Sequence, residues 1–261
     1  MQQKLSMKDS SKYYLTDHYS WVKTETGTFI CAHETADGLV YSVLSQDKHT
    51  LLEGNASYME FKKNDKLVDS PSAAYIYRIQ CPNLWDCIGT NIIRQVIRAS
   101  QAKNMYRIFS EYVGERVILT SGIHYHLFPS PQKVLETPDS TYQRMGMSFK
   151  KDALKSAARF ILEHADRLEK IQALDLLDEL MKIHRVGSWT ARATVADYTN
   201  ELAIYPYGDA AIRFYAREAL PRHEWPKEEV AFIQELHKVA GVENISSSIA
   251  TLIMIHEIKR S

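Results

Sequence analysis

The chain has 261 residues, enough for one large domain or two modest ones. Apolar residues make up 45% and charged residues 25%, which is ordinary for a soluble globular protein. Basic and acidic residues number 32 each, so the formal net charge is zero. This balance argues against salt-sensitive contact with many phosphates, but it leaves room for a local basic face.

The termini and the cysteines limit the compartment. No apolar run approaches the roughly 20 residues of a membrane helix, and the N-terminal segment MQQKLSMKDSSKYY lacks the apolar region of a secretory signal. Cys31, Cys81 and Cys87 cannot form a full disulfide framework and lack zinc-finger spacing, so no metal site is predicted. We therefore expect a protein of the cytoplasm, or of the nucleus in a eukaryote, with no membrane association.

The first 80 residues predict a β-rich domain. Short runs rich in Tyr, Thr, Val and Phe are separated by TETG and TADG, which is typical of β-hairpins. The segment AAYIYRIQ, residues 73–80, predicts a further strand, and CPNLWD then marks a boundary. The expected division is an N-terminal antiparallel β-sheet domain over residues 1–80 and a helical body over residues 81–261.

From residue 83 onward the pattern is helical. In LWDCIGTNIIRQVIRASQAKNMYRIFSEYVG, apolar residues recur near the 3.6-residue period through Val96 and Ile97, and Gly114 is the expected C-cap. A short helix is expected after Ser130 and a longer one after Ser148 as its N-cap. Further helices are predicted in ALDLLDELMKI, KEEVAFIQELHKVA and SSIATLIMIHEIK. The fold class is therefore mainly α with an α+β N-terminal part.

The stretch HRVGSWTARATVAD predicts a turn that leads into a helix. The preceding helix must end before Gly187, which is expected to take a positive φ or to allow another backbone to approach closely. The next helix begins at or near Ser188, its candidate N-cap, and the unpaired N–H groups of its first turn attract an anion such as a DNA phosphate. By spacing alone, an ordinary helical hairpin of the core is the more frequent explanation.

The stretch YPYGDAAIRFYA places Asp209 beside Gly208 at the start of a helix. Aspartate is a favoured N-cap residue, so by itself the pattern favours a cap over a catalytic carboxylate.

Together the two stretches resemble the helix-hairpin-helix DNA glycosylases, in particular their bacterial 3-methyladenine glycosylase II branch. The hairpin falls in order on the family pattern L-P-G-I-G-x-W-T-A, and YPYGD falls on the family's F-P-x-G-D. Upstream, IIRQVIRASQA, LFPSPQKV and MGMSFKKDALKSAARFI resemble three more family segments in the same order. The similarity covers about residues 83 to 255, and the branch carries a β-rich N-terminal domain like the one expected here.

The resemblance implies that Asp209 is catalytic. Cleavage of an N-glycosidic bond develops positive charge on the sugar, which a fixed carboxylate stabilises while it orients or deprotonates the attacking water. The resemblance also implies a set of DNA-binding residues in the hairpin: Arg185, Val186, Gly187, Ser188 and Thr190.

Some positions depart from the family pattern. Arg185 replaces the first hairpin glycine, which predicts a less tight turn and an added phosphate contact. Trp189 stands where some branches carry a catalytic lysine, so no amine is offered there for a Schiff base. Ala193 replaces an aromatic pocket residue, and no cysteine beyond Cys87 is present to hold the iron–sulfur cluster of other branches. The identity of the damaged base is therefore left open.

The target base must leave the duplex stack before the reaction, at a cost of a few kcal/mol. Val96 and Ile97, next to Gln95, are candidates for the side chain that fills the gap, although core packing is the more frequent explanation for either one. Trp189 is a candidate for stacking on the base, with a core tryptophan as the equal alternative.

The sequence thus predicts a monofunctional DNA glycosylase that flips out and hydrolyses a damaged base, an alkylated purine in the first instance. We expect a monomer acting on double-stranded DNA with no redox cofactor and no covalent intermediate. The main-chain carbonyls of the hairpin are expected to offer a site for a monovalent cation, as in relatives. Two alternatives stay open: a non-catalytic DNA-binding protein, and an oxidised-purine glycosylase/lyase with a relocated lysine such as Lys182.

Overall fold

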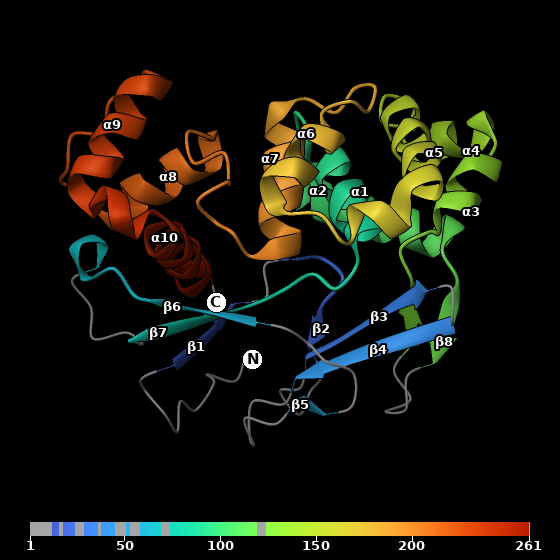
Figure 1. The fold of residues 1–261 in the computed structure, drawn as a ribbon, viewed down its shortest axis with the longest axis horizontal. Helices are drawn as coiled ribbons and strands as arrows, with labels where there is room; N and C mark the ends of the chain where they lie inside the picture. Colours follow the sequence, from blue (N-terminus) through green and yellow to red (C-terminus); the bar gives the residue numbers. More distant parts are fainter. Residues whose placement is uncertain are drawn as a thin grey trace. The chain divides into compact units, whose positions relative to one another are not determined.

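The computed structural model describes residues 12–15, 18–23, 29–35, 38–44, 51–52, 58–68, 74–118 and 124–260 (Figure 1). The chain forms two compact units. Unit 1 takes Met1–Thr16, Tyr58–Gln80 and Asn200–Ser261, and unit 2 takes Asp17–Ser57 and Cys81–Thr199. The expected domains were two consecutive segments that meet at residue 80. In the structure the strands of residues 1–80 are divided between the two units, and the last helices belong to the same unit as the first strand.

Unit 1 is a three-stranded sheet covered by helices. The sheet has the order β1 (Lys12–Leu15), β7 (Tyr75–Ile79), β6 (Tyr58–Lys62), in which β1 is parallel and β6 antiparallel to β7. The helices are α8 (Ala210–Ala219), α9 (Glu229–Ala240) and α10 (Ile245–Arg260). Figure 1 shows α10 lying along the sheet, where it packs against β6, β7 and α8.

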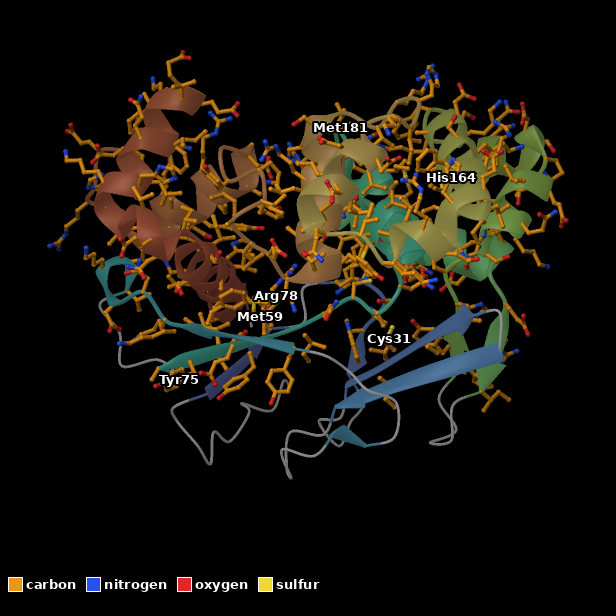
Figure 2. All side chains as sticks on the ribbon, viewed as in Figure 1. Cys31, Met59, Tyr75, Arg78, His164 and Met181 are labelled. Atoms are coloured by element: carbon orange, nitrogen blue, oxygen red, sulfur yellow. The ribbon has the colours of Figure 1, made fainter. Side chains whose placement is uncertain are left out.

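Three buried polar side chains organise unit 1: Arg78, Asn200 and Asn64. Arg78 of β7, labelled in Figure 2, donates to Oδ1 of Asn200 at 2.8 Å, and Asn200 returns a bond to the Arg78 carbonyl at 3.1 Å. Asn64 begins the 3₁₀ turn Asp65–Leu67 and ties it to α10 through Thr251 and Ser248, at 2.9 and 2.8 Å. These bonds satisfy groups that would otherwise be costly to bury.

Unit 2 is built around α1 (Leu84–Arg94), which packs against α2 (Ala99–Val113), α5 (Lys151–Leu168) and α7 (Ser188–Thr199). Its other helices are α3 (Pro131–Glu136), α4 (Asp139–Arg144) and α6 (Ala173–Leu180). A four-stranded antiparallel sheet has the order β2 (Val22–Lys23), β3 (Phe29–Thr35), β4 (Gly38–Leu44), β5 (Leu51–Leu52). A separate hairpin pairs β8 (Arg116–Ile118) with β9 (His124–His126).

The start of α1 is fixed by a cap and its middle by close packing. The Asn83 side chain accepts a hydrogen bond from the Asp86 N–H at 3.0 Å, which satisfies one unpaired donor of the first turn. Gly89 lies against the ring of Phe128, and a Cβ there would come within 2.4 Å of two ring carbons. The same ring stacks on Tyr106 at 5.1 Å, so α1 is held against an aromatic cluster.

The predicted fold class is confirmed, since helices dominate and the sheets are small. The predicted strand within residues 73–80, the short helix after Ser130 and the cap at Gly114 are all present. Two local predictions are wrong. The cap of α5 is Lys150 and not Ser148, because a turn closed by Lys150 N–H to Met147 O comes first. The helical pattern also breaks between Arg94 and Ala99.

Among the described residues no single helix is long and apolar enough to cross a membrane. Only the pair Glu229–Ala240 and Val242–Lys259, bent by 93°, meets that length and composition together.

Candidate nucleic-acid interface and active site

The hairpin between α6 and α7 is a compact turn closed by backbone bonds. The N–H groups of Lys182, Ile183 and Val186 each donate to the carbonyl three residues earlier in the chain, at 3.1, 3.2 and 3.0 Å. Ile183 and Val186 are buried, whereas Arg185 and the residues from Gly187 to Ser188 are exposed. The apolar side chains anchor the turn while its backbone tip faces solvent.

The left-handed residue of the hairpin is Arg185, with φ 66°. This position corresponds to the first glycine of the family pattern, so the arginine adopts the backbone conformation that glycine would take more easily. Its guanidinium lies 3.6 Å from Asp152, and its side chain is 54% exposed. Gly187 does not take a positive φ, so the first of the two roles expected for it is wrong.

Gly187 instead caps α7 and leaves its N-terminus open. The Gly187 carbonyl accepts from the Ala191 N–H at 3.0 Å, which makes Gly187 the N-cap and Ser188 the first helical residue; the cap expected at Ser188 is therefore wrong. A Cβ on Gly187 would meet no heavy atom within 4 Å. An anion can therefore approach the unpaired N–H groups of the first turn.

Gln95 joins the end of α1 to the hairpin. Its Nε2 donates to the Arg185 carbonyl at 3.1 Å and to Thr190 Oγ1 at 2.8 Å. Its own carbonyl accepts from Lys150 Nζ at 2.6 Å. Lys150 is buried, and this burial lowers the pKa of its amine to about 8. The side chain and the backbone carbonyl of Gln95 thus connect the end of α1 to the hairpin that begins α7 and to the start of α5.

Val96 follows Gln95 with φ 60° and a fully exposed side chain. A β-branched residue is strained in this left-handed region, and strain of this kind concentrates at functional sites. The alternative that Val96 is a core residue is therefore wrong, whereas its neighbour Ile97 is half-buried.

Trp189 is half-buried at the start of α7 and is not a core residue. The guanidinium of Arg94 lies 5.6 Å from the centre of its indole ring. Arg94 is held there by Asp197 at 3.3 Å and by Asn91 at 2.9 Å. Ala193, at the position of the family's aromatic residue, is fully buried, so it offers no stacking surface.

Asp209 stands at the N-cap position of α8 in unit 1, with φ −57° and ψ 150°. Its side chain makes no capping hydrogen bond, and within the described residues its carboxylate has no ion pair. The preceding Gly208 is packed against α9, where a Cβ would lie 2.8 Å from Glu229 and Ile233. An N-cap role thus explains where Asp209 stands in the chain. It gives no task to the carboxylate of this half-buried residue, because the carboxylate makes no capping bond.

The comparisons with known proteins agree with these observations. No family model and no curated protein matches the chain. Solved structures do match: 3-methyladenine DNA glycosylase from Archaeoglobus fulgidus has a TM-score of 0.67 at 13% identity, over 93% of this chain and 91% of that one. The 8-oxoguanine glycosylase/lyase of Clostridium acetobutylicum, in its apo form, reaches 0.60 at 15% identity, over 92% and 89%.

A third structure, 3-methyladenine DNA glycosylase of Schizosaccharomyces pombe with abasic DNA, gives a TM-score of 0.51 at 18% identity, over 65% of this chain and 78% of that one. At such identities the likeness establishes the fold. The chain has the fold of the helix-hairpin-helix DNA glycosylases, which confirms the predicted resemblance.

The predicted site residues fall into two groups. Hydrogen bonds join Gln95, Arg185 and Thr190 in unit 2, whereas Asp209 belongs to unit 1. Sequence reasoning missed Lys150 and Arg94, because a lysine or arginine on a helical pattern gives no sign of what it contacts. Lys182 is exposed and pairs with Glu179 at 2.7 Å.

We predict that Gly187→Ala folds normally but binds any DNA duplex about tenfold more weakly, a loss of about 1.4 kcal/mol. The added methyl group contacts nothing in the protein, yet it occupies the space through which a phosphate reaches α7. Duplex affinity and the thermal midpoint of unfolding are measured together. Gly146→Ala is the control: its φ of 69° predicts lower stability with unchanged affinity. Wild-type affinity in the Gly187 variant would exclude the hairpin as the anchor.

Proposed function

We propose that the protein is a monofunctional DNA glycosylase that excises a damaged base, an alkylated purine in the first instance, from double-stranded DNA. The observation that carries the proposal is the Asp209 carboxylate, which stands at a helix start without serving as its cap. The glycosylase fold and the open hairpin support it. We further propose that the protein acts as a monomer.

Asp209 acts on the sugar of the target nucleotide. As the bond from C1′ to the base nitrogen breaks, positive charge spreads over C1′ and the ring oxygen, and the fixed negative charge stabilises it. The same carboxylate orients a water molecule and accepts its proton as the new C–O bond forms. An alkylated purine leaves without protonation by the enzyme, because alkylation has already activated it.

The hairpin and the segment after α1 handle the DNA. The first turn of α7 binds a phosphate through its N–H groups, assisted by Arg185, Ser188 and Thr190. Val96 enters the space that the flipped base vacates, and Ile97 supports it. Trp189 stacks on the extrahelical base.

The monovalent cation of relatives fits the donors present. The carbonyls of Ile183, Arg185 and Gly187 each accept one hydrogen bond and keep a second lone pair. When bound, such a cation supplies positive charge beside a phosphate. The chain's own part is to hold these carbonyls in place, which the Gln95 bond to Arg185 does.

A glycosylase/lyase is the second candidate, favoured by one observation. The amine of Lys150 has its pKa lowered to about 8 by burial, so a larger share of it is uncharged at neutral pH than for an ordinary lysine. Its bond to the Gln95 carbonyl at 2.6 Å argues for a structural role. Lys182, the amine considered from the sequence, is engaged by Glu179.

We predict that Asp209→Asn lowers base release by on the order of 10²-fold or more while DNA binding survives. The amide keeps the shape of the side chain and loses the charge. Single-turnover release of base from an alkylated duplex measures the rate, and affinity for an abasic-site analogue measures binding. Asp166→Asn, an exposed aspartate of α5, is the matched control. Near-normal release by the Asp209 variant would refute its catalytic role.

We predict opposite effects of Val96→Gly on stability and activity. Glycine adopts φ 60° without strain, which offsets its greater freedom in the unfolded chain, so the thermal midpoint is unchanged or higher. Excision from duplex falls roughly tenfold, since about 1.4 kcal/mol of gap filling is lost. Excision from a single strand, which has no stack to open, serves as the control. An equal loss on both substrates would contradict the gap-filling role.

We predict that the product is an intact abasic site. Trp189 has no amine, so water is the only nucleophile, and strand breaks appear only after hot alkali. Borohydride traps no enzyme–DNA adduct. Trp189→Lys gains little lyase activity, because the new amine also needs a lowered pKa and an aligned sugar. Prompt strand cleavage by wild type that disappears in Lys150→Met would establish the second candidate instead.

A further inference from the structure

Three buried side chains of unit 2 gather their metal-binding atoms at one point. They are His18, in the turn before β2, Cys81, just before α1, and Cys87, in the first turns of α1. One ring nitrogen of the imidazole and the two Sγ atoms all lie within 4.8 Å of one another. None of these residues takes part in the site described above.

The start of α1 brings the two cysteines together. The Cys87 N–H bonds to the Asn83 carbonyl at 3.1 Å, which turns the chain back so that Cys87 faces Cys81. The Cys81 N–H bonds to the Asp197 carbonyl of α7 at 3.3 Å, which fixes the residue before the helix. Backbone bonds therefore fix the main chain of both cysteines, and the sulfur atoms can still move by side-chain rotation.

The imidazole of His18 is positioned by Ser20 through one ring nitrogen. Its Nδ1 lies 2.7 Å from Ser20 Oγ and accepts a hydrogen bond from the Ser20 N–H at 3.3 Å. The ring also interacts with the Cys81 side chain, and its Nε2 is buried. Metal binding through Nε2 requires the ring proton to lie on Nδ1 and to be donated to Ser20 Oγ, which leaves the Nε2 lone pair for the ion.

The three donors can occupy three of the four positions around a tetrahedral ion. With zinc–sulfur bonds near 2.3 Å and zinc–nitrogen bonds near 2.0 Å, neighbouring donors lie about 3.5 to 3.8 Å apart. The observed limit of 4.8 Å requires the three donors to close by no more than about 1.3 Å. Rotation of the cysteine and histidine side chains achieves this.

The charges also balance. Two thiolates and a neutral imidazole around a divalent cation give a net charge of zero, which is the least costly state for a buried site.

We propose that His18, Cys81 and Cys87 bind one zinc ion as a structural site. Thiolate and imidazole donors select zinc over hard cations. The ion fastens the turn at residues 18–20 to the start of α1, the helix that ends in Arg94 and Gln95. The inference does not depend on the proposed glycosylase activity.

The test is the metal content of untagged protein, purified without chelators from cells supplied with zinc. We expect about one zinc per chain, and loss of most of it in Cys87→Ala and in His18→Ala. Removal of zinc with a chelator lowers the thermal midpoint of wild type, and added zinc restores it, whereas neither treatment shifts the midpoint of Cys87→Ala or His18→Ala. Cobalt in place of zinc gives the charge-transfer absorption of a thiolate ligand, which Cys87→Ala lacks.

Cys31→Ala is the matched control. Cys31, labelled in Figure 2, is as buried as the other two cysteines but does not belong to the cluster, so its variant keeps the metal. Wild-type protein that holds no metal and binds neither zinc nor cobalt overturns the proposal, whether or not the variants fold. Equal metal content in all four proteins also overturns it, and copper found in place of zinc overturns the assignment of the ion.

Discussion

The candidate interface depends on the side chain of Gln95. It is the first residue after α1, and its amide bonds to the Arg185 carbonyl and to the Thr190 hydroxyl. One helix end, one hairpin and one helix start are thereby held at fixed separation. The strained backbone at Val96 and Arg185 lies on either side of these bonds, and the surrounding bonds are what allow both residues to stay left-handed. The bond from Lys150 to the Gln95 carbonyl adds the start of α5 to the same junction.

The elements that follow simple periodicity were predictable from the sequence. The helical segments predicted from the apolar pattern appear as α5, α6, α9 and α10, the short helix after Ser130 is α3, and Gly114 is the cap of α2. The order of five short segments predicted the glycosylase fold, which comparison with solved structures then established. Local patterns therefore identify the helices, and their order along the chain identifies the architecture.

The details of the site depend on tertiary contacts that a local pattern does not contain. Val96 fits the apolar period of α1, yet the helix ends at Arg94 and the side chain lies in solvent. The positive φ falls on Arg185 and not on the nearby glycine, and the local sequence pattern does not show which of the two takes it. The His18 cluster has no recognisable spacing, since the histidine and the cysteines meet only when the sheet turn and α1 come together.

The two compact units do not correspond to contiguous stretches of sequence. The chain passes between them at residues 16/17, 57/58, 80/81 and 199/200. No single cut releases either unit complete, because unit 1 needs its first strand, its middle strands and its last three helices. Neither unit can therefore be exchanged with another protein as one inserted segment.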